Sequence, residues 1–173
     1  EGRVLPAGEV GEIFGKPAIG LSAKYVGPQS LKCEDGGFFS VGDLGWLDEE
    51  GYLYISDRRS DMIVTGGKNV YTAEGENAIF DYPGIIDAVV IGIPDQLWGL
   101  KVHAILEIEG PESEFSPDDL NEFLHTKLSG YKCPKTYEIV QDMPRNEMGK
   151  VRRRELIEQH LSGLSEHEHN APA

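Results

Sequence analysis

The chain has 173 residues, of which 39% are hydrophobic and 27% are charged, as in a globular protein with one ordinary domain or a small domain plus a fragment. Its formal net charge of −14 excludes a general nucleic-acid binder and disfavours docking on an anionic membrane. Cys33 and Cys133 offer neither a disulfide framework nor zinc-ligand spacing, so we expect a reducing, cytoplasmic location. The most apolar run, 85–93, contains Asp87, and we therefore expect no transmembrane segment.

The first part of the chain, 1–56, is rich in glycine and in short β patterns. Residues 10–14 and 38–41 are expected strands, and residues 46–55 predict a β-hairpin around the loop Asp48-Glu49-Glu50-Gly51. Apolar stretches that could build an independent core are few here. We therefore expect 1–56 to be a β-rich fragment of a larger neighbouring domain.

From about residue 61 the pattern changes to mixed strands and helices. Ser116 followed by Pro117 predicts a helix start, because serine caps helix N-termini and proline suits the first turn. In chain order the expected elements are strands at 62–65 and 69–71 around Gly66-Gly67, a helix at 73–82, strands at 88–93 and 102–108, the helix from 116, a strand at 137–140 and a helix at 152–161. This order predicts a small α+β domain at 62–161, followed by a disordered polar tail at 162–173.

Three separated motifs carry residues suited to a nucleotide: Ser40-Val41-Gly42-Asp43, Gly51 to Asp61, and Pro144-Arg145-Asn146-Glu147-Met148-Gly149-Lys150. The carboxylate of Asp43 can accept hydrogen bonds from both hydroxyls of a ribose, and Arg58 offers a planar fork of donors. Lys150 can neutralise charge that develops on a phosphate. Each alone could be a turn or surface residue, but their order together favours nucleotide binding.

In order and wording these motifs resemble the adenylate-forming superfamily, which includes acyl-CoA synthetases, firefly luciferase and the adenylation domains of peptide synthetases. The resemblance covers about 8–157. It implies that Asp43 binds the AMP ribose, that Arg58 contacts the nucleotide and that Lys150 is the catalytic lysine of adenylation. It also implies a hinge at Ser60, about which the small domain rotates.

The resemblance further implies a coenzyme A site in the small domain. Gly66 and Gly67 would line the pantetheine tunnel, Trp98 would lie near the coenzyme, and Lys132 could meet its phosphates. Core packing for Trp98 and a plain charge cluster around Lys132 are the open alternatives. We expect no metal ligands from this chain.

By the same resemblance, 1–56 is the end of a large N-terminal AMP-binding domain, 57–61 the hinge and 62–161 the mobile C-terminal α+β domain. The expected function is that of an AMP-forming acid–CoA ligase. Such an enzyme activates a fatty or other hydrophobic acid with ATP to acyl-AMP and transfers the acyl group to coenzyme A. The N-terminal domain would supply the phosphate loop, the adenine and acid pockets and Mg²⁺, so we expect this chain alone to be inactive.

Two alternatives to the CoA ligase remain open. One is the adenylation domain of a peptide synthetase, whose thiol belongs to a carrier protein. The other is a non-catalytic interaction module.

Four further titratable residues fall within expected elements. Glu74 and Glu76 lie in the first turn of a helix, where the helix dipole favours acids. His103 and His125 lie alone on a strand and on a helix, and the sequence identifies no partner for either.

Overall fold

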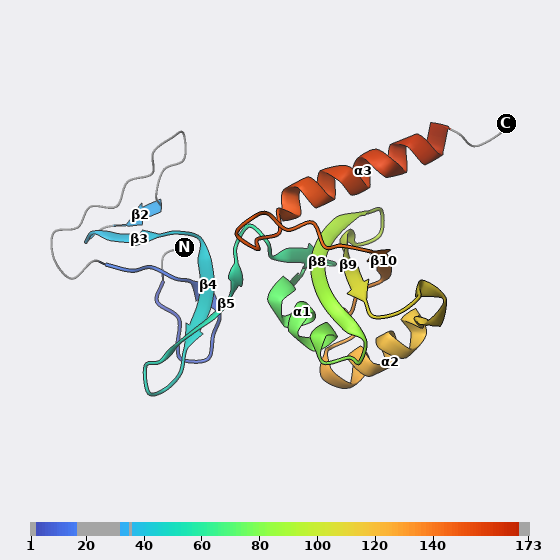
Figure 1. Cartoon of the computed structure of the whole chain (residues 1–173). Helices are drawn as coiled ribbons and strands as arrows, with labels where there is room; N and C mark the ends of the chain where they lie inside the picture. The colour runs from blue at the N-terminus through green and yellow to red at the C-terminus, as the bar shows by residue number, and fades with distance from the viewer. Residues whose placement is uncertain (1–2, 17–31, 35, 170–173) are drawn as a thin grey trace. The chain divides into compact units, whose positions relative to one another are not determined.

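The structure is a computed structural model that describes residues 3–16, 32–34 and 36–169 (Figure 1). The chain divides into two compact units, Glu1–Ser60 and Asp61–Ala173. The division falls inside 57–61, the segment for which we expect the hinge.

The first unit is made of short antiparallel strands. β1 (Gly11–Glu12), β4 (Asp43–Leu47) and β5 (Leu53–Arg58) form one sheet in the order β1-β4-β5, and β2 (Lys32–Glu34) pairs with β3 (Phe38–Ser40). β4 and β5 form the predicted hairpin, in which Trp46 lies opposite Tyr54 and stacks on it with ring centroids 4.4 Å apart. Among the described residues of this unit, Leu44 alone is a buried hydrophobic side chain. The described part of this unit therefore has little core of its own, as its sequence predicts.

The second unit is built around a five-stranded sheet. Its strands are β6 (Ile63–Thr65), β7 (Lys68–Val70), β8 (Ile85–Asp95), β9 (Gly99–Ile108) and β10 (Thr136–Val140). β8 and β9 form a long antiparallel pair, and β10 runs parallel to β9. A parallel neighbour requires a crossover, and the crossover from β9 to β10 carries the 3₁₀ turn Glu112–Glu114 and helix α2 (Pro117–Lys127).

Both faces of this sheet are covered, which explains the nearly continuous apolar runs of β8 and β9. Successive residues of a strand point to opposite faces. On one face Val90 and Leu106 pack with Ile79 of α1 (Thr72–Phe80) and Leu124 of α2. On the other face the core includes Leu156 of α3 (Arg153–His169), together with Val89, Ile91, Ile93, Ile105 and Met143. Figure 1 shows α3 apart from α1 and α2.

The start of α2 confirms the sequence prediction. Ser116 has an extended backbone, and its Oγ accepts a hydrogen bond from the backbone N–H of Asp119 at 3.2 Å. Pro117 follows as the first helical residue, where its missing N–H costs nothing. Leu120 and Leu124, one turn apart, are fully buried.

The last helix differs from the expectation. α3 extends to His169, so the disordered tail expected from residue 162 is wrong for 162–169, whereas 170–173 lie outside the described residues. A helix already nucleated adds one hydrogen bond for each residue that it fixes, and therefore continues beyond its buried first turns. No helix of the described residues is both long and apolar enough to cross a membrane.

Candidate functional site

In the first unit the structure brings Asp43 and Arg58 together. They lie opposite each other at the start of β4 and the end of β5, with Arg58 Nε 3.6 Å from Asp43 Oδ1. The turn before Asp43 is fixed because Ser40 Oγ accepts a hydrogen bond from the N–H of Gly42, whose φ of 88° favours glycine. The Arg58 side chain is 70% exposed and that of Asp43 28% exposed. A carboxylate and a guanidinium are thus presented side by side, as ribose and phosphate recognition requires.

In the second unit Lys150 ends a tight loop, 146–150, between β10 and α3. The side chain of Asn146 accepts hydrogen bonds from the backbone N–H groups of Met148 and Lys150, at 3.0 and 2.9 Å. The backbone N–H of Gly149, with φ of 73°, donates to the carbonyl of Asn146 at 2.8 Å. The Lys150 side chain is exposed and makes no ion pair within the described part of the chain. The loop therefore fixes the backbone of Lys150 and leaves its ammonium group available.

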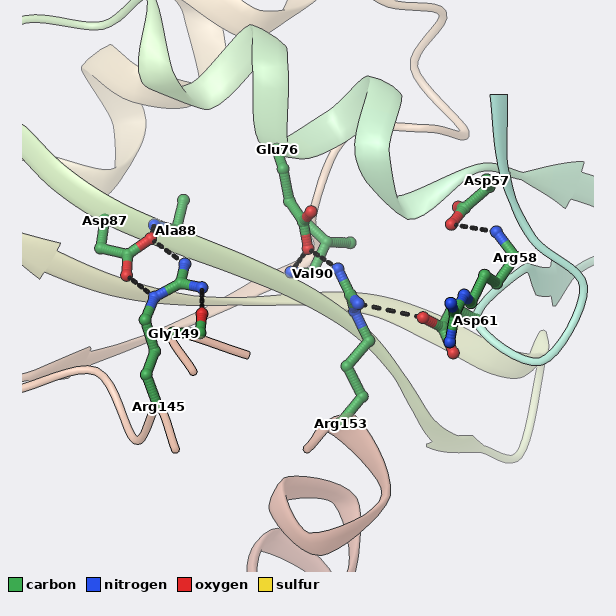
Figure 2. Close-up of polar contacts among 10 residues, drawn as sticks. All are labelled: Asp57, Arg58, Asp61, Glu76, Asp87, Ala88, Val90, Arg145, Gly149 and Arg153. Atoms are coloured by element: carbon green, nitrogen blue, oxygen red, sulfur yellow. Dashed lines mark hydrogen bonds and ion pairs between the residues drawn. The ribbon is translucent and has the colours of Figure 1, made fainter. Parts of the chain in front are cut away.

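Arg145 ties this loop to the sheet (Figure 2). Its Nε and Nη2 donate to the two carboxylate oxygens of Asp87 on β8 at 2.5 and 2.7 Å, and its Nη1 donates to the Gly149 carbonyl at 2.8 Å. The hydrogen bond from Arg145, opposed in part by burial, lowers the pKa of Asp87 below its ordinary value. Asp87 reciprocally raises the pKa of Arg145. The Arg145 guanidinium thus links strand β8 to Gly149, the residue before Lys150.

A second arginine fixes the start of α3. Arg153 donates to Glu76 of α1 at 2.6 Å and to Asp61 at 3.0 Å (Figure 2). Glu76 also accepts the backbone N–H of Val90 at 2.9 Å. The interpretation of Glu76 as a helix-dipole residue missed this network, because its partners lie 14 and 77 positions away in the sequence.

Gly66 and Trp98 lie together, as candidates for a thiol channel. Gly66 and Gly67 form the β6–β7 turn with φ of 53° and 76°. The Gly66 N–H donates to the Trp98 carbonyl at 3.0 Å, and a Cβ on Gly66 would lie 2.8 Å from the indole ring. Nothing lies within 4 Å of a Cβ on Gly67. The indole is 47% exposed, so it is not simply core packing.

Lys132 is engaged within the fold. Its Nζ lies 2.6 and 2.7 Å from the two carboxylate oxygens of Glu74. Glu74 is therefore an ion-pair partner as well as a first-turn acid. A phosphate would have to compete with this carboxylate for Lys132.

The loop before Lys150 and the Gly66–Trp98 contact lie at opposite ends of the β8–β9 pair. Arg145 binds Asp87, opposite Glu107, whereas Trp98 precedes Gly99, which pairs with Asp95 at the other end. The eight residue-to-residue steps of an extended strand from Asp87 to Asp95 span about 26 Å. The second unit thus presents a cationic loop and a glycine–indole surface at two well-separated ends.

The comparisons with known proteins decide the family. Residues 74–150 match the family described as AMP-binding enzyme C-terminal domain. The chain is 42% identical, over 157 residues, to the fatty acid–[acyl-carrier-protein] ligase ScoC of Streptomyces coeruleorubidus, covering 90% of this chain and 30% of the relative. The chain therefore carries an AMP-binding enzyme C-terminal domain.

Two further relatives are acid–CoA ligases by name. It is 40% identical, over 161 residues, to the long-chain-fatty-acid–CoA ligase FadD13 of Mycobacterium tuberculosis, covering 92% of the chain and 31% of the relative. The o-succinylbenzoate CoA synthetase MenE of Bacillus subtilis, solved with its acyl-adenylate intermediate, matches with a TM-score of 0.75 and 34% identity, over 90% of the chain and 32% of that structure. The chain spans about a third of the length of these relatives.

Proposed function

We propose that this chain is the C-terminal part of an AMP-forming acid–thiol ligase, in which the second unit serves two half-reactions in turn. The observation that carries the proposal is that the Lys150 loop is tied to Asp87, whereas the Gly66–Trp98 contact lies beside the Asp95–Gly99 pair at the other end of β8 and β9. Two surfaces at opposite ends of a rigid sheet cannot face one active site together. A rotation of the whole unit would present each in turn.

In the first half-reaction an oxygen of the acid's carboxylate attacks the α-phosphorus of ATP, and pyrophosphate leaves with the electrons of the broken P–O bond. Negative charge builds on the phosphoryl oxygens as the new bond forms. The Lys150 ammonium group, held by the 146–150 loop, would stabilise that charge. Asp43 and Arg58 of the first unit would hold the ribose and orient the nucleotide.

In the second half-reaction a thiol attacks the carbonyl carbon of the acyl-adenylate, and AMP leaves as a thioester forms. Here Gly67 would lie against the pantetheine arm, since no neighbouring atom fills the space above it. We place the hinge at Ser60, next to the division between the two units. A few residues at the end of an element suffice to absorb such a rotation.

The remaining parts of the site would come from an N-terminal domain. We assign the adenine, acid and Mg²⁺ sites to that domain, because this chain spans only about a third of the length of its relatives. The N-terminal domain is thus the necessary partner of this chain, and we propose that the chain alone has no ligase activity. Two free cysteines fit a reducing, cytoplasmic location.

For the acid, we propose a fatty or other hydrophobic carboxylic acid, because the relatives named above include fatty-acid ligases. The thiol could be coenzyme A, as in the name of FadD13, or a carrier protein, as in the name of ScoC. Coenzyme A is our first candidate. Carrier-protein transfer is the second candidate, and it is specifically favoured by the 42% identity to ScoC.

The test is Lys150→Ala in the full-length enzyme that carries this chain. Removing one preorganised charge-stabilising group should slow acid-dependent pyrophosphate release by about 10²–10³-fold. Lys127→Ala is the matched control, because Lys127 is a surface lysine of α2 paired with Asp81 at 2.8 Å. Equal rates for the two variants would refute the assignment of Lys150.

A further inference from the structure

Two histidines and a glutamate from three separate elements meet on the α3 side of the sheet. His103 lies on β9, Glu138 on β10 and His160 on α3. One donor atom from each lies within 4.8 Å of the other two. We propose that these three residues form a binding site for a divalent transition-metal ion, with Zn²⁺ as the best match. This site is separate from the ligase chemistry proposed above.

The topology explains why these residues converge. Thr136 of β10 pairs with His103 in the parallel register, and Glu138 lies two residues further along β10, on the same face. In α3, His160 follows Leu156 and Ile157 by four and three residues, so it shares the helical face that packs on the sheet. The interpretation of His103 as an isolated strand histidine was therefore incomplete. The sequence separation of these residues concealed the cluster.

The burial and hydrogen bonding of His103 suit a metal ligand. Its side chain is only 3% exposed, and its buried Nε2 has no hydrogen-bond partner among the residues that the structure describes. Its Nδ1 lies 2.8 Å from Thr136 Oγ1. When Nδ1–H donates to that hydroxyl, the lone pair of Nε2 is left for a metal, which is the usual arrangement of a metal-bound histidine.

The two distances from the histidines to the Glu138 carboxylate suit a tetrahedral ion, and the third donor–donor distance is at most 4.8 Å. Glu138 Oε2 lies 3.6 Å from His103 Nε2 and 3.4 Å from His160 Nδ1. Ligands about 2.0–2.1 Å from a tetrahedral Zn²⁺ are separated by about 3.4 Å from one another. The two imidazole rings, with centroids 4.7 Å apart, are tilted by 44° and not stacked. A small movement of the partly exposed His160 would complete the geometry.

The charge balance also favours a cation. The Glu138 carboxylate favours a bound cation, whereas Lys101 is the cationic neighbour that opposes it. Glu138 is 48% exposed, which leaves an entry path and room for water as a fourth ligand.

Two nitrogens and one carboxylate oxygen match the preferences of Zn²⁺, and Co²⁺ can occupy the same ligands as a spectroscopic probe. A bound ion would join α3 to β9 and β10. The predicted consequence is a second unit that is more stable when metal is present, since an ion that binds only the folded state stabilises it.

The experiment is titration of the metal-free 173-residue chain with Zn²⁺ in a calorimeter and with Co²⁺ in a visible spectrometer. We expect one equivalent of each metal to bind and Co²⁺ to develop the intense visible bands of tetrahedral coordination. Zn²⁺ should also raise the urea midpoint. Glu138→Gln and His160→Gln should each weaken binding at least tenfold, and Thr136→Val should weaken it about 10–100-fold by releasing the His103 ring.

The controls separate this cluster from other histidines. His125→Ala removes an exposed histidine of α2, and the double variant His167→Ala/His169→Ala removes the two nearest the C-terminus. Both should bind Zn²⁺ like the parent chain. The proposal is overturned if the parent chain binds no Zn²⁺ at 100-fold excess, if binding survives in Glu138→Gln and His160→Gln, or if the 167/169 variant abolishes it.

Discussion

Replacing Arg145 with alanine should destabilise the second unit. It should also slow the first half-reaction, although Lys150 itself is unchanged. Arg145 makes three hydrogen bonds, two to the Asp87 carboxylate and one to the Gly149 carbonyl. Asp87 is only 15% exposed, so truncation leaves its charge poorly compensated, while Arg145 is 38% exposed and water recovers part of the loss. Hydrogen bonds to charged groups contribute about 1.5–3 kcal/mol, and with this partial exposure we expect a net loss of about 2 kcal/mol.

Urea unfolding measures this loss. With a slope of about 1.5 kcal/mol/M, a loss of 2 kcal/mol lowers the midpoint by roughly 1.3 M. Arg154→Ala is the matched control, since Arg154 is 92% exposed and its one ion pair among the described side chains is with Glu158 on the same helix. That control should shift the midpoint by less than about 0.3 M.

The interaction of Arg145 with Asp87 should also make the unfolding free energy depend on pH. Asp87 has a folded-state pKa below its ordinary value of 3.8, chiefly because of the hydrogen bond from Arg145. A carboxylate with a lowered folded-state pKa stabilises the protein above its unfolded pKa, and that stability is lost as the pH falls through the folded value. The difference in unfolding free energy between the parent and Arg145→Ala should therefore be full at pH 7 and shrink below about pH 4.

Arg145→Ala should also slow pyrophosphate release in the full-length enzyme, because the loop that places Lys150 loses its tie to the sheet. Arg145→Lys should behave similarly, since an ammonium group cannot replace the fork of donors. The reasoning is refuted if Arg145→Ala shifts the urea midpoint no more than Arg154→Ala, or if it leaves pyrophosphate release at the parent rate.

The remaining predictions concern the second unit. Gly66→Ala should lower the free energy of unfolding, measured with urea, by about 1–3 kcal/mol. The reason is that its Cβ would lie 2.8 Å from the Trp98 ring and that φ at this position is 53°. Gly67→Ala has a similar φ but open space, so its cost should stay near 1 kcal/mol; equal costs would contradict the Trp98 contact. Ser116→Ala should lower the unfolding free energy by about 1 kcal/mol through loss of its N-cap hydrogen bond, and no change in the urea midpoint would argue against that cap.

The sequence predicted the elements whose signals are local. A serine followed by proline marked the start of α2, and two glycines marked the β6–β7 turn, because both patterns act over a few residues. The predicted hairpin at 46–55 was also local, and the structure shows that its strands bring Asp43 opposite Arg58, a pairing that was not predicted from the sequence. The nucleotide and coenzyme roles came from the family resemblance and stay predictions.

The long-range contacts could not be predicted. Arg145 lies 58 positions from Asp87, and Arg153 lies 77 from Glu76, so nothing in their local sequence indicates the pairing. His103, Glu138 and His160 converge only because β10 runs parallel to β9 and α3 packs on that face. The available signal was the two-residue period of the strands, which places His103 and Glu138 on the face that α3 covers.

The central claim is that one small domain presents Lys150 in the first half-reaction and Gly67 in the second. The direct measurement compares Lys150→Ala and Gly67→Leu in the full-length enzyme, with pyrophosphate release for the first step and thioester yield from synthetic acyl-AMP for the second. We predict a crossover: Lys150→Ala slows the first step by about 10²–10³-fold and largely spares the second, whereas Gly67→Leu does the reverse. If either variant slowed both steps equally, the alternation of the two surfaces would be contradicted.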